Sequence, residues 1–184
     1  MNISIKRMGS LAAIPASLLL TNPAFAHPGH DTGFVAGLVH PFTGIDHLAA
    51  MSMVGLWSGL AFPQSKLRLP AIMLAALLGG FLYGDWGGAM AFPEMLIQAT
   101  LAVLALTLAL DLKLRTHAAA LLVAVTGLAH GFAHGVEVPA GTDPRSFLVG
   151  FFLSSTALLA AGLGLARVVT RSGLRAPVKL RAGR

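Results

Sequence analysis

The chain lacks cysteine and is poor in charged residues. Among its 184 residues there is no Cys, and only 11% are Asp, Glu, Lys or Arg, against about 25% in an ordinary soluble domain. Without thiols, a disulfide, a thiolate metal site and a cysteine nucleophile are all excluded. Any metal site must therefore use His, carboxylate, Met or backbone groups. Hydrophobic residues make up 55% and the mean hydropathy is +0.76, which predicts a membrane protein.

Several functional motifs are also missing from the sequence. It contains no GxxxxGK[ST] nucleotide-binding loop, no HExxH zinc-protease helix and no GxSG pattern around Ser58. The net charge is +6, but the basic residues are scattered in short loops and a tail between apolar segments. Membrane topology explains that distribution better than nucleic-acid binding, so no nucleic-acid partner is expected. We also do not expect an enzyme.

The N-terminal segment, residues 1–26, has the pattern of a cleavable signal peptide. A pair of basic residues precedes an apolar stretch at about 8–20, and Ala24-Phe25-Ala26 fits the small-x-small cleavage pattern. The mature chain is then predicted to begin at His27. An uncleaved signal anchor is the alternative, but the apolar stretch is short for a membrane crossing.

The rest of the chain divides into apolar segments of membrane-spanning length. A crossing helix needs about 20 mostly apolar residues, and the gaps between segments carry Pro and charged residues. The predicted fold is an all-α compact bundle of about five transmembrane helices, forming one domain at 27–168 with a basic cytoplasmic tail at 169–184. Residues 33–43 are too short to cross alone and are predicted to form a half-helix or re-entrant stretch. The predicted crossings are 44–62, 69–90, 93–110, 117–136 and 146–168.

The distribution of Lys and Arg predicts the orientation, because short cytoplasmic loops carry excess positive charge. With the mature N-terminus periplasmic and the C-terminus cytoplasmic, every basic residue after residue 26 except Arg145 falls inside. We therefore predict a multi-pass protein of the bacterial inner membrane. The same topology collects His and carboxylate groups into an outer surface, apart from Asp111 and His117. The residues predicted on the outer side are Asp31, Asp46, Asp85, Glu94, Glu137, Asp143, His27, His30, His40, His47, His130 and His134.

The first candidate metal-binding segment leads into the first predicted crossing. His47 and Met51 project together at i, i+4, and Gly44 favours a break just before them. An ionisable side chain at the entrance to a crossing is costly and suggests a functional role. Thr43 and Asp46 alternatively form a capping box that only starts the helix. The candidate ligands here are His40, Asp46, His47 and Met51.

The second candidate segment lies near the end of the predicted crossing 117–136. His130, His134 and Glu137 occupy i, i+4 and i+7, which puts two imidazoles and a carboxylate on one helical stripe. An i, i+4 His pair can bind one metal ion. The alternative is simple helix packing, with each His bonded to a backbone carbonyl.

Two weaker patterns complete the set. The predicted mature N-terminus offers His27, His30 and Asp31 for metal capture. Glycines at four-residue spacing indicate close helix packing. They are Gly80, Gly84 and Gly88 in one segment and Gly127, Gly131 and Gly135 in another.

The first segment resembles a known family signature. The pattern His40-Pro41-x-x-Gly44-x-Asp46-His47-x-x-Ala50-Met51-x-x-Val54-Gly55, followed later by His130-Gly131-x-x-His134-Gly135, is similar to the HupE/UreJ family of nickel/cobalt permeases. The resemblance implies a secondary transporter that brings Ni²⁺ or Co²⁺ across the inner membrane, beside hydrogenase, urease or cobalamin pathways. It implies metal-site roles for His40, Asp46, His47 and Met51.

The ligand chemistry agrees with that implication but leaves alternatives open. Imidazole, carboxylate and thioether suit Ni²⁺, Co²⁺, Zn²⁺ or copper better than Mg²⁺ or Ca²⁺. We expect a transported ion and no permanently bound cofactor, with Zn²⁺ as a third candidate after Ni²⁺ and Co²⁺. A scaffold that hands metal to a partner, and an intramembrane metalloenzyme, are the competing classes. Homo-oligomerisation is left open.

Overall fold

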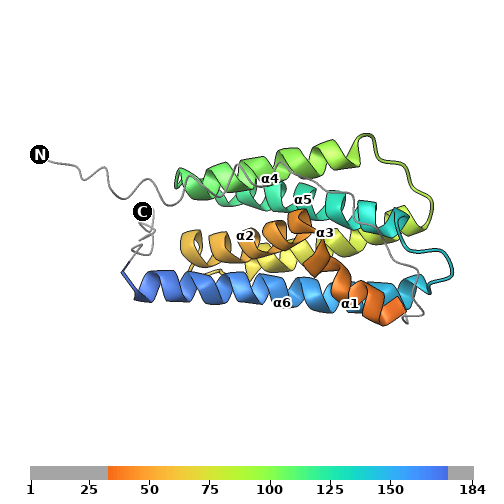
Figure 1. Cartoon of the computed structure of the whole chain (residues 1–184). Helices are drawn as coiled ribbons and strands as arrows, with labels where there is room; N and C mark the ends of the chain where they lie inside the picture. Colours follow the sequence, from red (N-terminus) through yellow and green to blue (C-terminus); the bar gives the residue numbers. More distant parts are fainter. Residues whose placement is uncertain (1–32, 174–184) are drawn as a thin grey trace, which may run out of the picture.

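The computed structural model describes residues 33–173, which form a bundle of six helices without strands (Figure 1). The all-α prediction is thus confirmed for this part of the chain. The predicted signal peptide, the capture residues His27, His30 and Asp31, and the last part of the basic tail lie outside the described residues. The helices are α1 (Gly33–Thr43), α2 (Ile45–Ala61), α3 (Arg68–Asp85), α4 (Pro93–Ala109), α5 (Thr116–Val136) and α6 (Pro144–Arg171).

The helices run up and down the long axis of the molecule, so their connections, apart from the one between α1 and α2, collect at two opposite ends (Figure 1). α1 and α2 follow one another along the length of α6, and α3, α4, α5 and α6 then alternate in direction. Charge separates between the two ends. The acidic end carries Asp85, Glu94, Glu137 and Asp143 with Arg145, whereas the basic end carries Lys66, Arg68, Lys113, Arg115, Arg167 and Arg171 with Asp111.

Two of these helices, α5 with 21 residues and α6 with 28, are long and apolar enough to cross a membrane. At 1.5 Å per residue α6 is about 42 Å long, which exceeds a hydrocarbon core of about 30 Å. α1 and α4 are apolar but shorter. Each predicted crossing coincides with one helix, from α2 to α6, and the short segment predicted at 33–43 forms α1.

The interface between α3 and α5 is the most extensive in the bundle, and glycine makes it close. A Cβ added to Gly131 would lie 2.1 Å from the Leu77 carbonyl oxygen, and one added to Gly80 would lie 2.3 Å from that of Leu128. Backbone therefore meets backbone, as small residues at four-residue spacing allow. Gly84, Gly127 and Gly135 lie in the same interface.

Gly88 does not extend this row of glycines, contrary to the spacing argument. α3 ends at Asp85, and the chain turns through Gly87, which has a φ of +79°. The Cβ of a residue at position 88 would meet Tyr83 instead of a neighbouring helix. The four-residue spacing of glycines in the sequence continues to Gly88, although α3 stops at Asp85.

α6 is the support along which α1 and α2 lie. The Asp143 side chain accepts hydrogen bonds from two backbone amides in the first turn of α6, and Pro144 occupies the first helical position. Gly37 in α1 and Gly55 in α2 each approach the backbone of α6, at Phe147 and at Leu159. These contacts fix the position of both short helices against one long one.

The chain breaks between α1 and α2 at Gly44, whose φ of −89° and ψ of 111° are extended. The predicted capping box is wrong. Thr43 donates its hydroxyl to the His40 carbonyl 2.8 Å away, and Asp46 accepts from the His47 amide at 2.8 Å. Gly44 itself is the residue that precedes the helix. The break leaves His40 at the end of one helix and His47 at the start of the next.

From one turn below His47 towards the basic end, the interior is mostly apolar, and its buried hydroxyls on Ser58 and Thr107 bond to backbone carbonyls. α2, α3, α4 and α5 all contribute fully buried side chains to it. We call this region the apolar half. It contains Met51, Val54, Trp57, Leu69, Met73, Leu104 and Val123.

Candidate metal site

Four histidines from three helices meet at the α1–α2 break and form what we call the histidine cluster. His40 comes from α1, His47 from α2, and His130 and His134 from α5. The ring centroids of His40 and His134 are 4.5 Å apart, those of His47 and His134 are 5.2 Å apart, and those of His47 and His130 are 5.5 Å apart. The fold thus joins two sequence motifs that are far apart along the chain.

The cluster lies inside the bundle and becomes more buried with depth. The Glu137 side chain at the acidic end is 60% exposed and His40 is half-buried, whereas His134 is 9% exposed and His47 and His130 are 0% exposed. The sequence pattern predicts a histidine and carboxylate surface. The histidines instead occupy an interior site, where Phe147 and Phe151 of α6 pack against His40, His47 and His134.

His130 has one ring nitrogen whose role is fixed by its surroundings. Nδ1 lies 2.9 Å from the Thr126 carbonyl oxygen. Because a carbonyl only accepts, Nδ1 carries the hydrogen and donates it, which leaves Nε2 with a free lone pair. Nε2 is buried and has no hydrogen-bond partner among residues 33–173.

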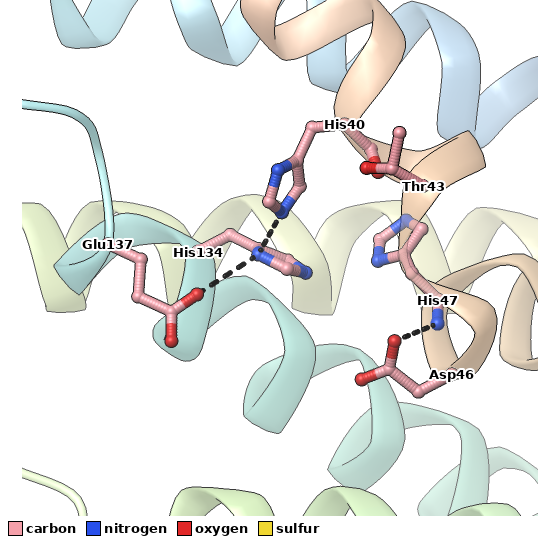
Figure 2. Close-up of polar contacts among 6 residues, drawn as sticks. All are labelled: His40, Thr43, Asp46, His47, His134 and Glu137. Atoms are coloured by element: carbon pink, nitrogen blue, oxygen red, sulfur yellow. Dashed lines mark hydrogen bonds and ion pairs between the residues drawn. The ribbon is translucent and has the colours of Figure 1, made fainter. Parts of the chain in front are cut away.

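In His47 and His134 too, one ring nitrogen has a hydrogen-bond partner among residues 33–173 and the other has none. His47 Nε2 lies 3.0 Å from the Ser155 hydroxyl, and His134 Nδ1 shares a 2.9 Å hydrogen bond with His40 Nε2 (Figure 2). Their other nitrogens, His47 Nδ1 and His134 Nε2, are buried without a partner in the described part of the chain. With His130 Nε2 they make three such atoms, which we call the unpartnered nitrogens.

Two carboxylates lie near the cluster, Glu137 just after α5 at the acidic end and Asp46 in the first turn of α2. Glu137 lies 3.8 Å from His134 Nδ1 (Figure 2), and Asp46 is within electrostatic reach of His40, His130 and Glu137. Partial burial, together with the negative charges of Glu94 and Asp46, raises the pKa of Glu137 above its ordinary value. A cation near these groups would relieve their mutual repulsion.

The cluster is not a preformed metal centre. Within residues 33–173, no three His, Asp or Glu side chains converge on one point with the geometry of a bound ion. His130 Nε2 is nevertheless a Lewis base, and the other two unpartnered nitrogens lie on neighbouring rings. A metal ion would have to draw these rings together, which suits transient binding better than permanent storage.

One predicted ligand, Met51, and Asp85 of the predicted outer surface lie outside the histidine cluster. Met51 is one helical turn below His47 and packs in the apolar half. Asp85 lines an open hollow of about 430 Å³ at the acidic end, together with Gly84, Gly135 and Thr142. The hollow is adjacent to the end of α5, but the histidines are not among its lining residues.

α6 supplies residues that the sequence analysis did not identify. The Phe151 ring lies 4.8 Å from that of His47 and 4.9 Å from that of His134, and Ser155 contacts His47. With Phe147, which faces His40, they form one stripe at four-residue spacing. The only signal for these residues in the sequence was the polar run 154–156 within the longest apolar helix. That signal is weak, because a hydroxyl on a helix can always bond a backbone carbonyl of the same helix.

An all-helical bundle with two helices long and apolar enough to cross a membrane fits a membrane protein, and its interior holds a cluster of four histidines. The family model described as "HupE / UreJ protein" matches residues 15–182. The chain is also 36% identical over 152 residues to Protein HupE of Rhizobium leguminosarum bv. viciae, covering 82% of this chain and 80% of that protein. The chain belongs to the HupE/UreJ family. No solved structure matches it.

Proposed function

We propose that this protein is a permease that takes up Ni²⁺, Co²⁺ or both across the inner membrane and supplies metalloenzyme maturation. The observation that carries the proposal is the set of three unpartnered nitrogens, found among residues 33–173 on His47, His130 and His134. Buried polar atoms are nearly always hydrogen-bonded, so three exceptions at one place need an explanation. Neutral imidazole nitrogen is a preferred ligand of divalent Ni, Co and Zn ions.

Membership of the HupE/UreJ family supports the choice of ion. The family is associated with nickel and cobalt uptake for hydrogenase and urease. Zn²⁺ is a weaker third candidate, because it accepts the same ligands. The ion is cargo in this proposal, and no permanent cofactor or catalytic activity is assigned.

The proposed topology has about five crossings, in which α1 and α2 together make the first. Both pack along α6, so the broken pair runs beside one long helix. The basic end faces the cytoplasm by the positive-inside rule, and the acidic end with the mature N-terminus faces the periplasm. A cleaved signal peptide is part of this topology. Partners are then the lipid bilayer and the ion, and a homo-oligomer is compatible with the exposed apolar surface.

The proposed path of the entering ion runs from exposed side chains at the acidic end to fully buried ones in the histidine cluster. Carboxylates at the acidic end, including Glu137 and Glu94, raise the local cation concentration. Half-buried His40 and the deeper His134 then replace part of the hydration shell, and His47 and His130 take over where water is excluded. Such a site must bind strongly enough to strip water and weakly enough to release the ion.

The exit requires a conformational change. Directly below His47 the buried side chains of Met51, Val54 and Met73 fill the interior towards the basic end. These side chains must separate before an ion can leave. The extended backbone at Gly44 already interrupts the helix between α1 and α2, so the side chains below His47 can separate without breaking a continuous helix there.

The test is uptake of radioactive Ni²⁺ by cells that lack other nickel importers. His47→Ala and His130→Ala each remove an unpartnered nitrogen and are expected to lower uptake by about tenfold or more at limiting Ni²⁺. His117→Ala is the matched control, because His117 is exposed on α5 at the basic end. Equal membrane levels are verified by immunoblot. Wild-type uptake in both site variants would refute the site.

The apolar half favours one alternative, a membrane scaffold that binds metal and hands it to a partner. Proteoliposomes that contain only this protein separate the two functions. Ni²⁺ entry that depends on His47 supports the permease. Binding without entry supports the scaffold.

A further inference from the structure

Ser155 is a fully buried polar residue in α6 to which the sequence patterns assign no role. Its side chain is 0% exposed and lies at the α2–α6 interface. The hydroxyl is 2.7 Å from the Phe151 carbonyl oxygen and 3.0 Å from His47 Nε2. It is therefore in contact with the histidine cluster from the helix that contributes no histidine to it.

The direction of these two hydrogen bonds follows from the number of hydrogens available. A serine hydroxyl has one hydrogen, and the Phe151 carbonyl can only accept it. The shorter of the two contacts, 2.7 Å to the Phe151 oxygen, takes this hydrogen, because two oxygens so close need one between them. The Ser155 oxygen is then left as an acceptor towards His47, and His47 Nε2 donates. In a neutral imidazole with hydrogen on Nε2, Nδ1 carries the lone pair.

We infer that Ser155 is a positioning residue that holds His47 in the tautomer that presents Nδ1 to the transported ion. This inference rests on the proposed function. His47 Nδ1 is one of the unpartnered nitrogens of residues 33–173, as the assignment requires. His130 is set the opposite way, since the Thr126 carbonyl takes its Nδ1 hydrogen and leaves Nε2 for the ion. The two histidines would bind through different ring atoms.

The surrounding packing makes Ser155 an effective support. One turn further along α6, Leu159 meets Gly55 so closely that a Cβ there would lie 2.2 Å from the Leu159 carbonyl oxygen. α2 and α6 therefore cannot slide apart easily, and the distance from His47 to Ser155 is fixed by the backbone. The Phe151 ring, 4.8 Å from the His47 ring, limits its rotation.

Without the hydroxyl, the His47 ring loses the only acceptor that the described residues offer to Nε2–H. The other tautomer, with hydrogen on Nδ1, then becomes competitive. That hydrogen would point towards the ion and block coordination. Groups that orient a metal-binding histidine are commonly worth about 10–100-fold in metal affinity.

The experiment compares Ni²⁺ binding by the purified full-length protein in detergent with that of three variants. Ser155→Ala is expected to weaken binding by about tenfold or more. Ser154→Ala is the matched control, because Ser154 is equally buried and bonds to the Gly150 and Phe151 carbonyls instead of a histidine. It should bind within about twofold of the wild type. Ser155→Thr keeps the hydroxyl and should restore binding. Thermal unfolding of each variant verifies that the bundle is intact.

A second measurement reads the tautomer without metal. Nitrogen-15 NMR of histidine-labelled protein reports which ring nitrogen is protonated, and the His47 signals are those missing from His47→Ala. The wild type and Ser154→Ala should show Nε2 protonated, and Ser155→Ala should show a mixture. Protonation of His47 at Nδ1 in the wild type would overturn the inference, as would Ser155→Ala that binds Ni²⁺ as tightly as Ser154→Ala. A wild type that binds no Ni²⁺ would instead contradict the proposed function.

Discussion

Around the α1–α2 break, His47 and His130 are fully buried, and each keeps one ring nitrogen without a partner among residues 33–173. In the apolar half, Met51, Val54 and Met73 are equally buried but carry no group that needs a strong hydrogen bond. Burial is the same in both regions, and its energetic consequence is opposite. Unsatisfied polar atoms lower stability, whereas close packing raises it. The packed helices around the histidine cluster therefore provide the stability that its unpartnered nitrogens lower, and under the proposed function the cluster is retained because it binds the ion.

The largest expected effect comes from a substitution that disrupts the close packing of the helices. Gly131→Ala places a Cβ 2.1 Å from the Leu77 carbonyl oxygen, and backbone cannot move away as a flexible side chain can. We expect a loss of about 3 kcal/mol in the free energy of unfolding. Unfolding in detergent, followed by circular dichroism, measures it.

The control for that substitution lies on the facing helix. A Cβ at Gly79 meets only a Leu128 side-chain carbon at 3.9 Å. Gly79→Ala should therefore be neutral or stabilising, since Ala favours a helix over Gly by about 1 kcal/mol. Equal stability losses in the two variants would contradict the close α3–α5 contact.

An effect of intermediate size is expected at the carboxylate beside the histidine cluster. Glu137→Gln removes an exposed carboxylate 3.8 Å from His134 Nδ1. An exposed charge contributes about 0.2–1 kcal/mol, so the half-saturating Ni²⁺ concentration should rise by roughly 1.5- to 5-fold with little change in maximal uptake. The shift should shrink at high salt, because exposed charges are screened. Concentration-dependent uptake at two ionic strengths measures both effects.

Asp85→Asn is the matched control for Glu137→Gln. Asp85 is an exposed carboxylate at the same acidic end, but it lines the open hollow and not the histidine cluster. Its half-saturating concentration should stay near that of the wild type. An equal shift in both variants would mean that the entrance responds to total charge and not to Glu137 in particular.

The smallest expected effect lies at the boundary between the two regions. Met51→Leu replaces a thioether one turn below His47 with a side chain of similar volume, and such exchanges cost less than about 1.5 kcal/mol. Because Met51 packs in the apolar half, we expect Ni²⁺ uptake within about twofold of the wild type. A tenfold loss at unchanged stability would instead make Met51 a ligand, as the family signature implies.

Much of the fold could be predicted because it depends on local pattern. Apolar stretches of sufficient length predict helices, and Pro with charged residues marks their ends, so α2 to α6 coincide with the predicted crossings. The glycine spacing in α5 depends only on helical periodicity. The capping box failed because Thr43 is the last residue of α1 and its hydroxyl bonds to the His40 carbonyl, which leaves Gly44 to precede α2.

The candidate site could be predicted only in part. His40, His47, His130 and His134 are visible because ionisable residues are rare in apolar segments, and their spacing within each motif is helical. Ser155 and Phe151 could not be found in this way. Serine is common in such helices and satisfies itself on its own backbone, and a phenylalanine among apolar residues carries no signal.

The amino-acid sequence alone determined that residues 33–173 would form an all-helical bundle, where positive charge would collect, and that His and carboxylate would be the side chains available to a metal ion, because these depend on composition and short spacing. Only the tertiary structure decided that His47 and His134 lie inside the bundle with ring centroids 5.2 Å apart. It also decided that α6 supplies Ser155 to orient His47. The physical reason is that burial and partner choice depend on how α2, α5 and α6 pack, and glycine contacts between distant segments control that packing.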